Sequence, residues 1–192
     1  MKKTNTGVKT PVFYTTFTSL LGTLYIAFTK RGVSRIYLDV DSEKAFVRDI
    51  EESLKRAVKR NDRGIAAFKR ELRYYFSSPE KTGMLSNQRP TNNGKPFSFR
   101  SPIDLLEGTH FERKVWLVIK KIPYGKVVSY KGLAIRIGRP EAVRAVGSAC
   151  KKNPLPILIP CHRVIGKDKS LRGYSSGIDI KRRLLEMEGV NI

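Results

Sequence analysis

A change of sequence character near the middle of the chain constrains its architecture more than any other feature. Between residues 80 and 100 the composition turns to Gly, Asn, Pro, Ser and basic residues. Such a stretch is typical of an exposed linker or insertion. We therefore expect two domains in this 192-residue chain, one over residues 1–100, with the basic linker at its end, and one over residues 101–192.

The sequence before the linker favours a β-sheet covered by helices. Runs rich in β-forming residues predict strands over residues 12–17, 22–28 and 33–38. Two amphipathic helices are expected next, one near Ser42 to Arg60 and one near Ile65 to Phe76. One face of the second helix would hold Phe68, Leu72, Tyr75 and Phe76.

The sequence after the linker predicts short helices joined by tight turns. Thr109 can cap a first helix, and Ser129 can cap a second helix that ends at Gly138. Pro140 suits the first turn of a third helix, which runs to about Cys150. The second and third helices resemble a helix-turn-helix.

The third predicted helix has an apolar face and a nearly bare outer face. Its inward positions are Val143, Val146, Gly147 and Cys150. The other positions hold one long cation, Arg144, and the small residues Ala142, Ala145, Ser148 and Ala149. A helix that reads base edges in the major groove would carry more Arg, Asn or Gln, whereas small side chains permit close approach to a minor groove. A tightly packed helix with Arg144 in solvent fits the pattern equally well.

Charge is the strongest compositional signal. The chain has 38 Lys and Arg against 17 Asp and Glu, a formal net charge of +21, spread over both halves. Such a field favours polyanions, most often nucleic acid, although a basic proteome or a thermophile's surface would give the same balance. No apolar run approaches the roughly 20 residues of a membrane span, and residues 1–7 do not resemble a secretory signal. We expect a soluble intracellular protein.

Two cysteines and two histidines limit the chemistry that the chain can perform. Cys150, Cys161, His110 and His162 are too few and too poorly spaced for a structural zinc site, so no metal is expected. A structural disulfide is disfavoured in a reducing cytosol. A lone Cys next to a His therefore indicates reactive chemistry rather than a cross-link.

Cys161 and His162 are adjacent within an apolar run, residues 157–165, that we expect to be buried and extended. Cysteine attacks as a thiolate, and because burial raises its pKa, activation needs a base such as His162. Adjacent residues on a strand point to opposite faces, so contact between the two requires a turn or a bridging water. Glu188 is a candidate to orient the imidazole. Without further context, a buried structural cysteine beside an incidental histidine has more weight.

Several motifs together resemble the O6-alkylguanine-DNA alkyltransferase (methylated-DNA–protein-cysteine methyltransferase) family. They lie at residues 111–116, 122–125, 129–130, 144–147, 153–154, 159–165, 173–175 and 181–189. The match covers residues 109–189 and is specific, because the Pro-Cys-His-Arg run and its flanks occur at the family's spacing. The resemblance implies an α+β fold, in which an RNase H-like α/β domain precedes a helical domain with a helix-turn-helix and the active-site segment. The N-terminal half alone shows only weak resemblance.

The resemblance also implies a reaction. An alkyl group would pass from O6-alkylguanine in DNA, with O4-alkylthymine as a further candidate, to Cys161 in one irreversible turnover without a cofactor. His162 would act as the base through a water, Glu188 would complete the relay, and Asn153 would brace the reactive turn. Around the guanine the family's pattern places Tyr130, Ser175, Tyr174 and the backbone of Cys161 and Val164.

The implied partner is double-stranded DNA, bound through its minor groove by a monomer in the cytoplasm or, in a eukaryote, the nucleus. Arg144 matches the residue that fills the space left by a flipped nucleotide, and the other expected DNA contacts are Ala142, Ala145, Ser148 and Lys167. Three alternatives remain open. A lesion-binding relative usually replaces the acceptor cysteine, a Cys-His hydrolase would not need the basic surface, and a transcription factor would leave the Pro-Cys-His run unexplained.

Overall fold

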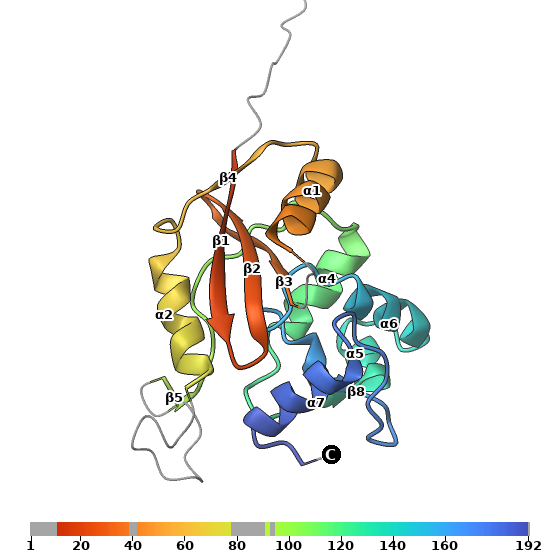
Figure 1. The fold of residues 1–192 in the computed structure, drawn as a ribbon. Helices are drawn as coiled ribbons and strands as arrows, with labels where there is room; N and C mark the ends of the chain where they lie inside the picture. Colours follow the sequence, from red (N-terminus) through yellow and green to blue (C-terminus); the bar gives the residue numbers. More distant parts are fainter. Residues whose placement is uncertain (1–10, 39–41, 78–90, 93–94, 192) are drawn as a thin grey trace, which may run out of the picture.

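The computed structural model describes residues 11–38, 42–77, 91–92 and 95–191. The segment 1–7 and most of the expected linker, residues 80–90 and 93–94, lie outside the described residues. Figure 1 shows the sheet and its helices from the first half of the chain beside a group of helices from the second half. This arrangement confirms the α+β class.

A four-stranded mixed sheet forms the first half. Its strands are β1 (Val12–Ser19), β2 (Gly22–Thr29), β3 (Gly32–Tyr37) and β4 (Val58–Arg60), in the order β3-β2-β1-β4. The pairs β1–β2 and β2–β3 are antiparallel, whereas β4 runs parallel to β1 at the edge. The three strands expected before residue 40 are therefore present.

The first helix is shorter than its sequence pattern predicts. Helix α1 (Glu43–Leu54) begins at the Ser42 cap but ends before Lys55, which takes a left-handed conformation with φ 51°. The expectation of a helix reaching Arg60 is wrong. Residues 58–60 instead pair with β1, because the sheet edge satisfies their backbone groups.

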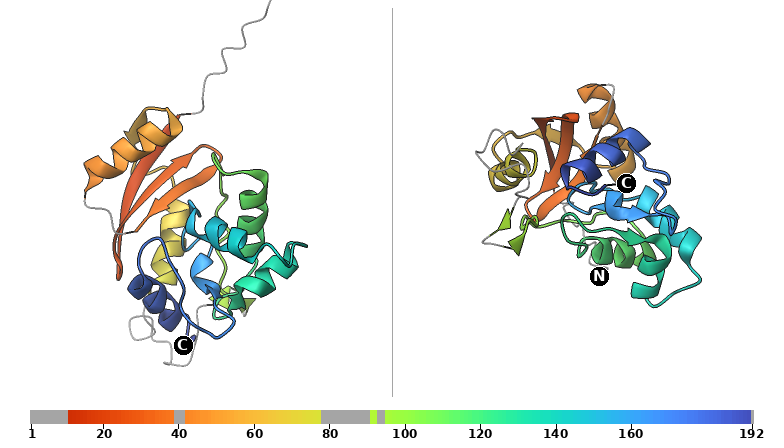
Figure 2. Two further views of the ribbon diagram at one scale, coloured as in Figure 1. Left: turned by 90° about the vertical axis from the view of Figure 1, so that its right-hand side faces the viewer. Right: turned by 90° about the horizontal axis from the view of Figure 1, so that it is seen from below.

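The two faces of the sheet are covered by different elements, as Figure 2 shows from two sides. Helix α1 packs on one face, where Phe46 and Ile50 join Val12 and Ala27 in a small core. Helix α2 (Ala66–Tyr75) and the second half of the chain cover the other face. The larger core on this face runs from the strands to the C-terminal helices without interruption and includes Leu24, Ile26, Phe68, Leu72, Trp116 and Leu184.

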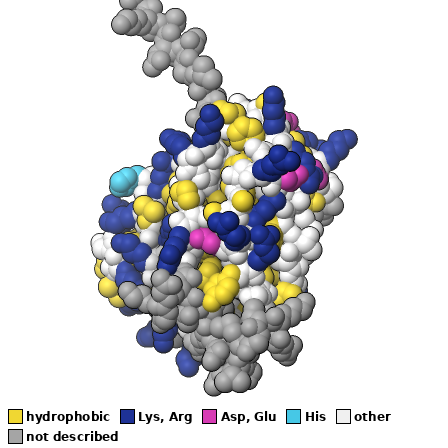
Figure 3. Space-filling view, turned by 90° about the vertical axis from the view of Figure 1, so that its left-hand side faces the viewer, with side chains coloured by type: hydrophobic (Ala, Val, Ile, Leu, Met, Phe, Trp, Pro, Cys, Tyr) yellow, Lys and Arg dark blue, Asp and Glu magenta, His cyan; other side chains and the backbone are white. Residues whose placement is uncertain are grey.

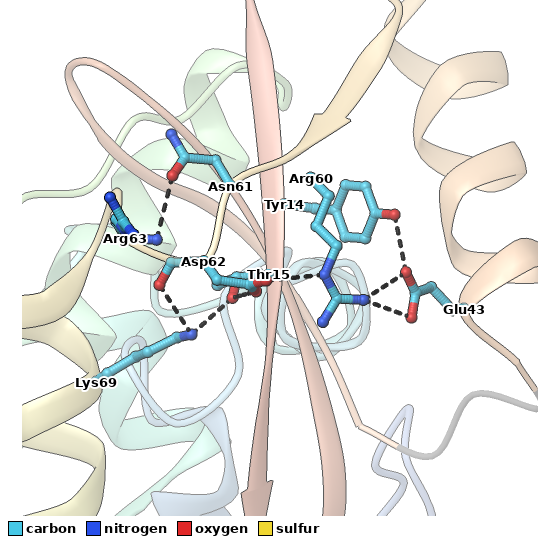
Figure 4. Close-up of polar contacts among 8 residues, drawn as sticks. All are labelled: Tyr14, Thr15, Glu43, Arg60, Asn61, Asp62, Arg63 and Lys69. Carbon is cyan, nitrogen blue, oxygen red and sulfur yellow. Dashed lines mark hydrogen bonds and ion pairs between the residues drawn. The ribbon is translucent and has the colours of Figure 1, made fainter.

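A surface network joins β1, β4 and the two helices of the first half (Figure 4). Arg60 donates to Glu43 and to Asp62, and Asp62 also accepts from the buried Thr15. Lys69 of α2 donates to the Thr15 hydroxyl at 2.7 Å. The network therefore ties the short edge strand to its neighbours, although exposed pairs of this kind stabilise little.

The end of the expected linker is part of the core. Strands β5 (Thr91–Asn92) and β6 (Lys95–Pro96) pair antiparallel, and Phe97, which follows β6, is only 3% exposed. Its ring contacts those of Tyr75 and Tyr124. The expectation of exposure is wrong for this end of the segment, because an aromatic side chain there fills the space between α2 and the second half.

The second half contains helices α4 (His110–Ile119), α5 (Tyr130–Arg136), α6 (Val143–Lys151) and α7 (Ile178–Met187). The predicted caps are confirmed: Thr109 forms a capping box with Glu112, and Ser129 accepts from Gly132. Helices α5 and α6 are joined by a short turn through Gly138, whose φ is +74°.

Helix α6 begins later than expected. Pro140 lies in the turn, where Ala142 N–H donates to the Arg139 carbonyl at 3.0 Å, and the helix starts at Val143. The placement of Pro140 in its first turn is wrong, since this turn leaves the backbone helical only from Val143 onward. Among the described residues, no helix combines the length and apolar character needed to cross a bilayer.

Candidate active site

The reactive segment is a turn rather than the expected strand. Cys161–Arg163 forms one turn of 3₁₀ helix, and only Val164–Ile165 pairs as a strand, β8, with β7 (Val128–Ser129). Prolines at 154, 156 and 160 remove backbone donors, so the preceding segment cannot enter a sheet ladder. The turn buries both reactive side chains, with Cys161 3% and His162 0% exposed.

Asn153 holds the turn from the end of α6. Its side-chain N–H₂ donates to the Cys161 Sγ at 3.0 Å and to the Ile159 carbonyl at 2.7 Å, while its Oδ1 accepts from Leu155 N–H. Burial raises the pKa of the Cys161 thiol, and the Asn153 donor and the Lys181 charge counteract part of that rise. The resting sulfur is therefore a thiol with a donor aimed at it.

His162 and Glu188 form the second part of the site. The His162 Nε2 lies 2.9 Å from the Glu188 Oε1, and both side chains are fully buried. Burial alone would raise the pKa of Glu188, but His162 and Arg163 together hold it well below its usual range. Burial, helped by the Arg163 and Lys181 charges, holds the pKa of His162 below its usual value, although Glu188 acts to raise it. At neutral pH the pair is thus a carboxylate and a neutral imidazole.

This charge state fixes the imidazole tautomer. An ionised carboxylate only accepts hydrogen bonds, so the proton of His162 must be on Nε2. The lone pair is then on Nδ1, which is buried and has no hydrogen-bond partner among the described residues. The nitrogen that is free to accept a proton is therefore the one that Glu188 does not occupy.

Two further side-chain partners of Glu188 were not predicted from the sequence. Arg163 donates from Nε to Oε2 at 2.7 Å and from Nη2 to Oε1 at 2.8 Å, and Tyr75 donates to Oε1 at 2.8 Å. Arg163 belongs to the Pro-Cys-His-Arg run, so its place next to His162 in the sequence could have indicated a role in the site. Tyr75 is 113 residues away from Glu188 on α2, and its only signal was a hydroxyl on an otherwise apolar face.

A cavity of about 980 Å³ opens beside the turn, between α5, α6 and the loop before α7. Its walls include Tyr130, Arg144, Gly147, Lys167, Arg172 and Tyr174. Cys161 is not among the lining residues. Burial, followed by the Cys150 and Cys161 sulfurs, raises the pKa of Tyr130 to about 12, and burial with the Cys161 sulfur raises that of Tyr174. The thiol therefore lies behind the wall that these two rings form.

The two remaining predicted pocket residues, Ser175 and Val164, lie in different surroundings. Ser175 is exposed and lines a second cavity of about 570 Å³, so the structure does not bring it together with Tyr130. The Val164 carbonyl accepts from the Lys181 Nζ at 2.6 Å. Lys181 is fully buried and also donates to the Arg172 carbonyl, so it joins the turn to the cavity loop.

The outer face of α6 agrees with its sequence pattern only in part. Val146 and Cys150 are buried, whereas Arg144, Ala145 and Ser148 are exposed and Ala142 is half-buried at the N-cap. Ala149 is buried against expectation, and Val143 and Gly147 are half-buried and line the cavity. The exposed Lys167 lines the same cavity as Arg144. Basic side chains are not confined to this face: Figure 3 shows Lys and Arg spread over the side that lies to the left in Figure 1.

Comparison with known proteins places this geometry in a family. Residues 110–190 match the family model described as 6-O-methylguanine DNA methyltransferase, DNA binding domain. The constitutive methylated-DNA–protein-cysteine methyltransferase of Bacillus subtilis is 37% identical over 93% of this chain and 96% of its own. The methylated-DNA–protein-cysteine methyltransferase of Saccharomyces cerevisiae is 32% identical over 96% of each chain.

Solved structures agree over the same length. Mycobacterium tuberculosis OGT in complex with DNA has a TM-score of 0.71 and 32% identity, over 92% of both chains. The O6-methylguanine-DNA methyltransferase of Pyrococcus kodakaraensis has a TM-score of 0.62 and 27% identity, over 93% of this chain and 99% of that one. With relatives this similar along nearly its whole length, the chain belongs to the methylated-DNA–protein-cysteine methyltransferase family.

Proposed function

We propose that the protein repairs DNA by moving an alkyl group from the O6 atom of a damaged guanine onto Cys161, once per molecule. One observation carries the proposal: the Cys161 sulfur lies 3.0 Å from the Asn153 amide, next to a buried His162–Glu188 pair whose free nitrogen can accept a proton. A buried structural cysteine would need neither partner.

Double-stranded DNA is the substrate, and α6 is its proposed docking element. The small exposed residues Ala145 and Ser148, with Ala142 at the N-cap, allow close approach of the helix to a minor groove. Arg144 would enter the duplex and fill the space left by the damaged nucleotide, and Lys167 would contact the phosphates. Residues 101–192 form the proposed catalytic domain and residues 1–100 the supporting one. The protein would act as a monomer in the compartment that holds DNA.

The damaged base has to leave the stack, because its O6 substituent cannot otherwise reach a buried sulfur. The cavity between Tyr130, Gly147 and Tyr174 is the proposed receiving pocket. Since Cys161 lies behind Tyr174, the loop that carries Tyr174 and Ser175 must shift as the base enters. Gly173 has open space where a side chain would be, which supports such a movement. The shift would also move Ser175 toward the base, and the Val164 backbone would bind its exocyclic amine.

The transfer is a displacement at the alkyl carbon. The Cys161 proton passes through a water to the His162 Nδ1, and Glu188 stabilises the imidazolium that forms. The sulfur then bonds to the alkyl carbon as the carbon–O6 bond breaks, and the electron pair goes to guanine. Tyr130 keeps its proton, since its pKa is raised to about 12, and can donate to the guanine as charge develops. The thioether product has no hydrolytic exit, so one turnover ends the reaction.

Intact-protein mass spectrometry tests this function. After incubation with duplex DNA that contains one O6-methylguanine, the wild-type mass should rise by one methyl group per chain. Cys150→Ala is the matched control because it removes the other cysteine and should still gain the methyl, whereas Cys161→Ala should bind DNA and gain nothing. Catalytic turnover would favour a hydrolase, and binding without a mass change would favour a lesion-binding protein.

A further inference from the structure

The Glu188 Oε1 atom is shared by three donors that come from distant parts of the chain. His162 approaches at 2.9 Å, Arg163 at 2.8 Å and the Tyr75 hydroxyl at 2.8 Å. The first two belong to the reactive turn. Tyr75 belongs to α2, in the half of the chain that holds the sheet. One of the three hydrogen bonds to this oxygen is therefore donated from the half of the chain that holds the sheet.

Tyr75 is held in place by packing as well as by its hydroxyl. Its side chain is 1% exposed, and its ring contacts the rings of Phe76, Phe97, Phe99 and Tyr124. A rigid aromatic cluster therefore aims the hydroxyl at Glu188. Burial and the neighbouring Glu188 charge raise the pKa of Tyr75 well above its usual value, so the hydroxyl remains a donor.

We propose that Tyr75 is a positioning residue for the alkyl transfer: its hydroxyl holds the Glu188 oxygen that faces His162 and limits how strongly that oxygen attracts the imidazole proton. The inference rests on the function proposed above. The half of the chain that holds the sheet would then contribute to the chemistry through the hydrogen bond from Tyr75 to Glu188.

The physical basis is competition for one acceptor. A carboxylate oxygen that accepts several donors has its charge more fully neutralised than one with fewer, so it is a weaker base. Arg163, Tyr124 and Lys181 are the other titratable groups that act on Tyr75 or His162 from the packed elements. A Tyr75→Phe change leaves all of them in place and removes only the hydroxyl. The Glu188 oxygen then becomes more basic and stabilises protonated His162.

Histidine-selective NMR tests the inference without any substrate, so it stays separate from a failure of the proposed function. The chain has only two histidines, and His110, exposed at the start of α4, supplies an internal reference. In Tyr75→Phe the His162 Nε2 proton resonance should move downfield at neutral pH. A second readout uses the substrate: in Tyr75→Phe, the acid limb of the pH profile for methyl transfer should move up by about half to one pH unit.

Thr29→Val is the matched control. Thr29 is also a buried hydroxyl that donates to a carboxylate in the second half of the chain, at 2.6 Å to Asp104, but Asp104 bonds Arg31 rather than a relay residue. This variant should lose stability and leave both readouts unchanged. Replacing Tyr75 by 3-fluorotyrosine, a stronger donor of similar size, should move both readouts the opposite way. Unshifted readouts in folded Tyr75→Phe, or equal shifts in Thr29→Val, would overturn the proposal.

Discussion

Two glutamates in this molecule accept nearly the same hydrogen bonds in opposite surroundings. Glu43, on the surface beside the sheet, accepts from Tyr14 at 2.8 Å and from Arg60 at 2.8 and 2.9 Å (Figure 4). Its side chain is 40% exposed and that of Arg60 is 46% exposed. Water and salt screen this network, so it fixes local geometry more than it stabilises the fold.

Glu188 repeats the pattern with Tyr75 and Arg163, but its side chain is 0% exposed and that of Arg163 is 6% exposed. It also accepts from His162 and from the Gly125 N–H. Because Glu188 is shielded from bulk solvent, every missing donor would leave part of its charge uncompensated. The same set of hydrogen-bond donors therefore does not by itself make a proton relay. Burial converts the same contacts into control over a neighbouring proton.

Neutralising Glu188 and neutralising Glu43 should differ most in their effects on stability and on methyl transfer. Glu188→Gln leaves Arg163 buried without its anion and leaves His162 with a neutral amide in place of a carboxylate. The free energy of unfolding should fall by about 3–5 kcal/mol, and methyl transfer should slow by about 100-fold or more. Glu43→Gln should leave both close to wild type. Denaturant titration and single-turnover transfer assays measure the two effects, and equal losses in both variants would refute the distinction.

A second contrast separates exposed charges that bind DNA from those that do not. Arg144→Ala should slow repair of duplex DNA by about tenfold, because nothing then fills the space of the flipped base, and should leave reaction with free O6-alkylguanine unchanged. Arg60→Ala, on the sheet, should change neither rate. Parallel single-turnover rates on duplex and free base decide the matter. A uniform loss on both substrates would place Arg144 in the chemistry instead.

The smallest effect is a pH dependence of stability. The folded-state pKa of His162 lies below 6.5, so the unfolded chain takes up a proton first as the pH falls. Stability should therefore decline below pH 6.5, by up to about 1.4 kcal/mol per pH unit. The lowered pKa of Glu188 adds a further loss below pH 4.5. Denaturant titrations across this range measure the slope.

Glu43→Gln should keep the slope between pH 6.5 and 4.5, because the pKa of Glu43 is lowered from 4.5 by Tyr14 and Arg60 and the group does not titrate in that window. His162→Gln should flatten it. A wild-type curve that stays level below pH 6.5 would mean that the imidazole is already charged in the folded protein.

Local sequence signals predicted the parts of the fold that local physics decides. The Thr109 and Ser129 caps and the inward face of α6 follow from side chains within one or two turns of the backbone they serve. The end of α1 does not, because residues 58–60 leave the helix to pair with a strand more than 40 residues earlier in the chain. Local periodicity contains no information about a free sheet edge.

In the candidate site too, some residues could be predicted from the sequence and others could not. Cys161, His162, Asn153 and Glu188 were expected from the motif, and the structure places them as two neighbouring hydrogen-bonded pairs, Asn153 with Cys161 and His162 with Glu188. The composition of the apolar run predicts a buried extended segment, and only the family resemblance implied a turn at Cys161. Tyr75 was placed in a core face, because nothing in the pattern of α2 indicates which side chain its hydroxyl will meet.

Peptide mapping of the methylated protein tests the central claim most directly. Wild-type protein and Glu188→Gln are each incubated with one equivalent of O6-methylguanine duplex, and the methyl group is located by tandem mass spectrometry over time. We predict one methyl per chain on Cys161 in both, reached far more slowly in Glu188→Gln. A methyl on Cys150, or a Glu188→Gln protein that reacts as fast as wild type, would contradict it.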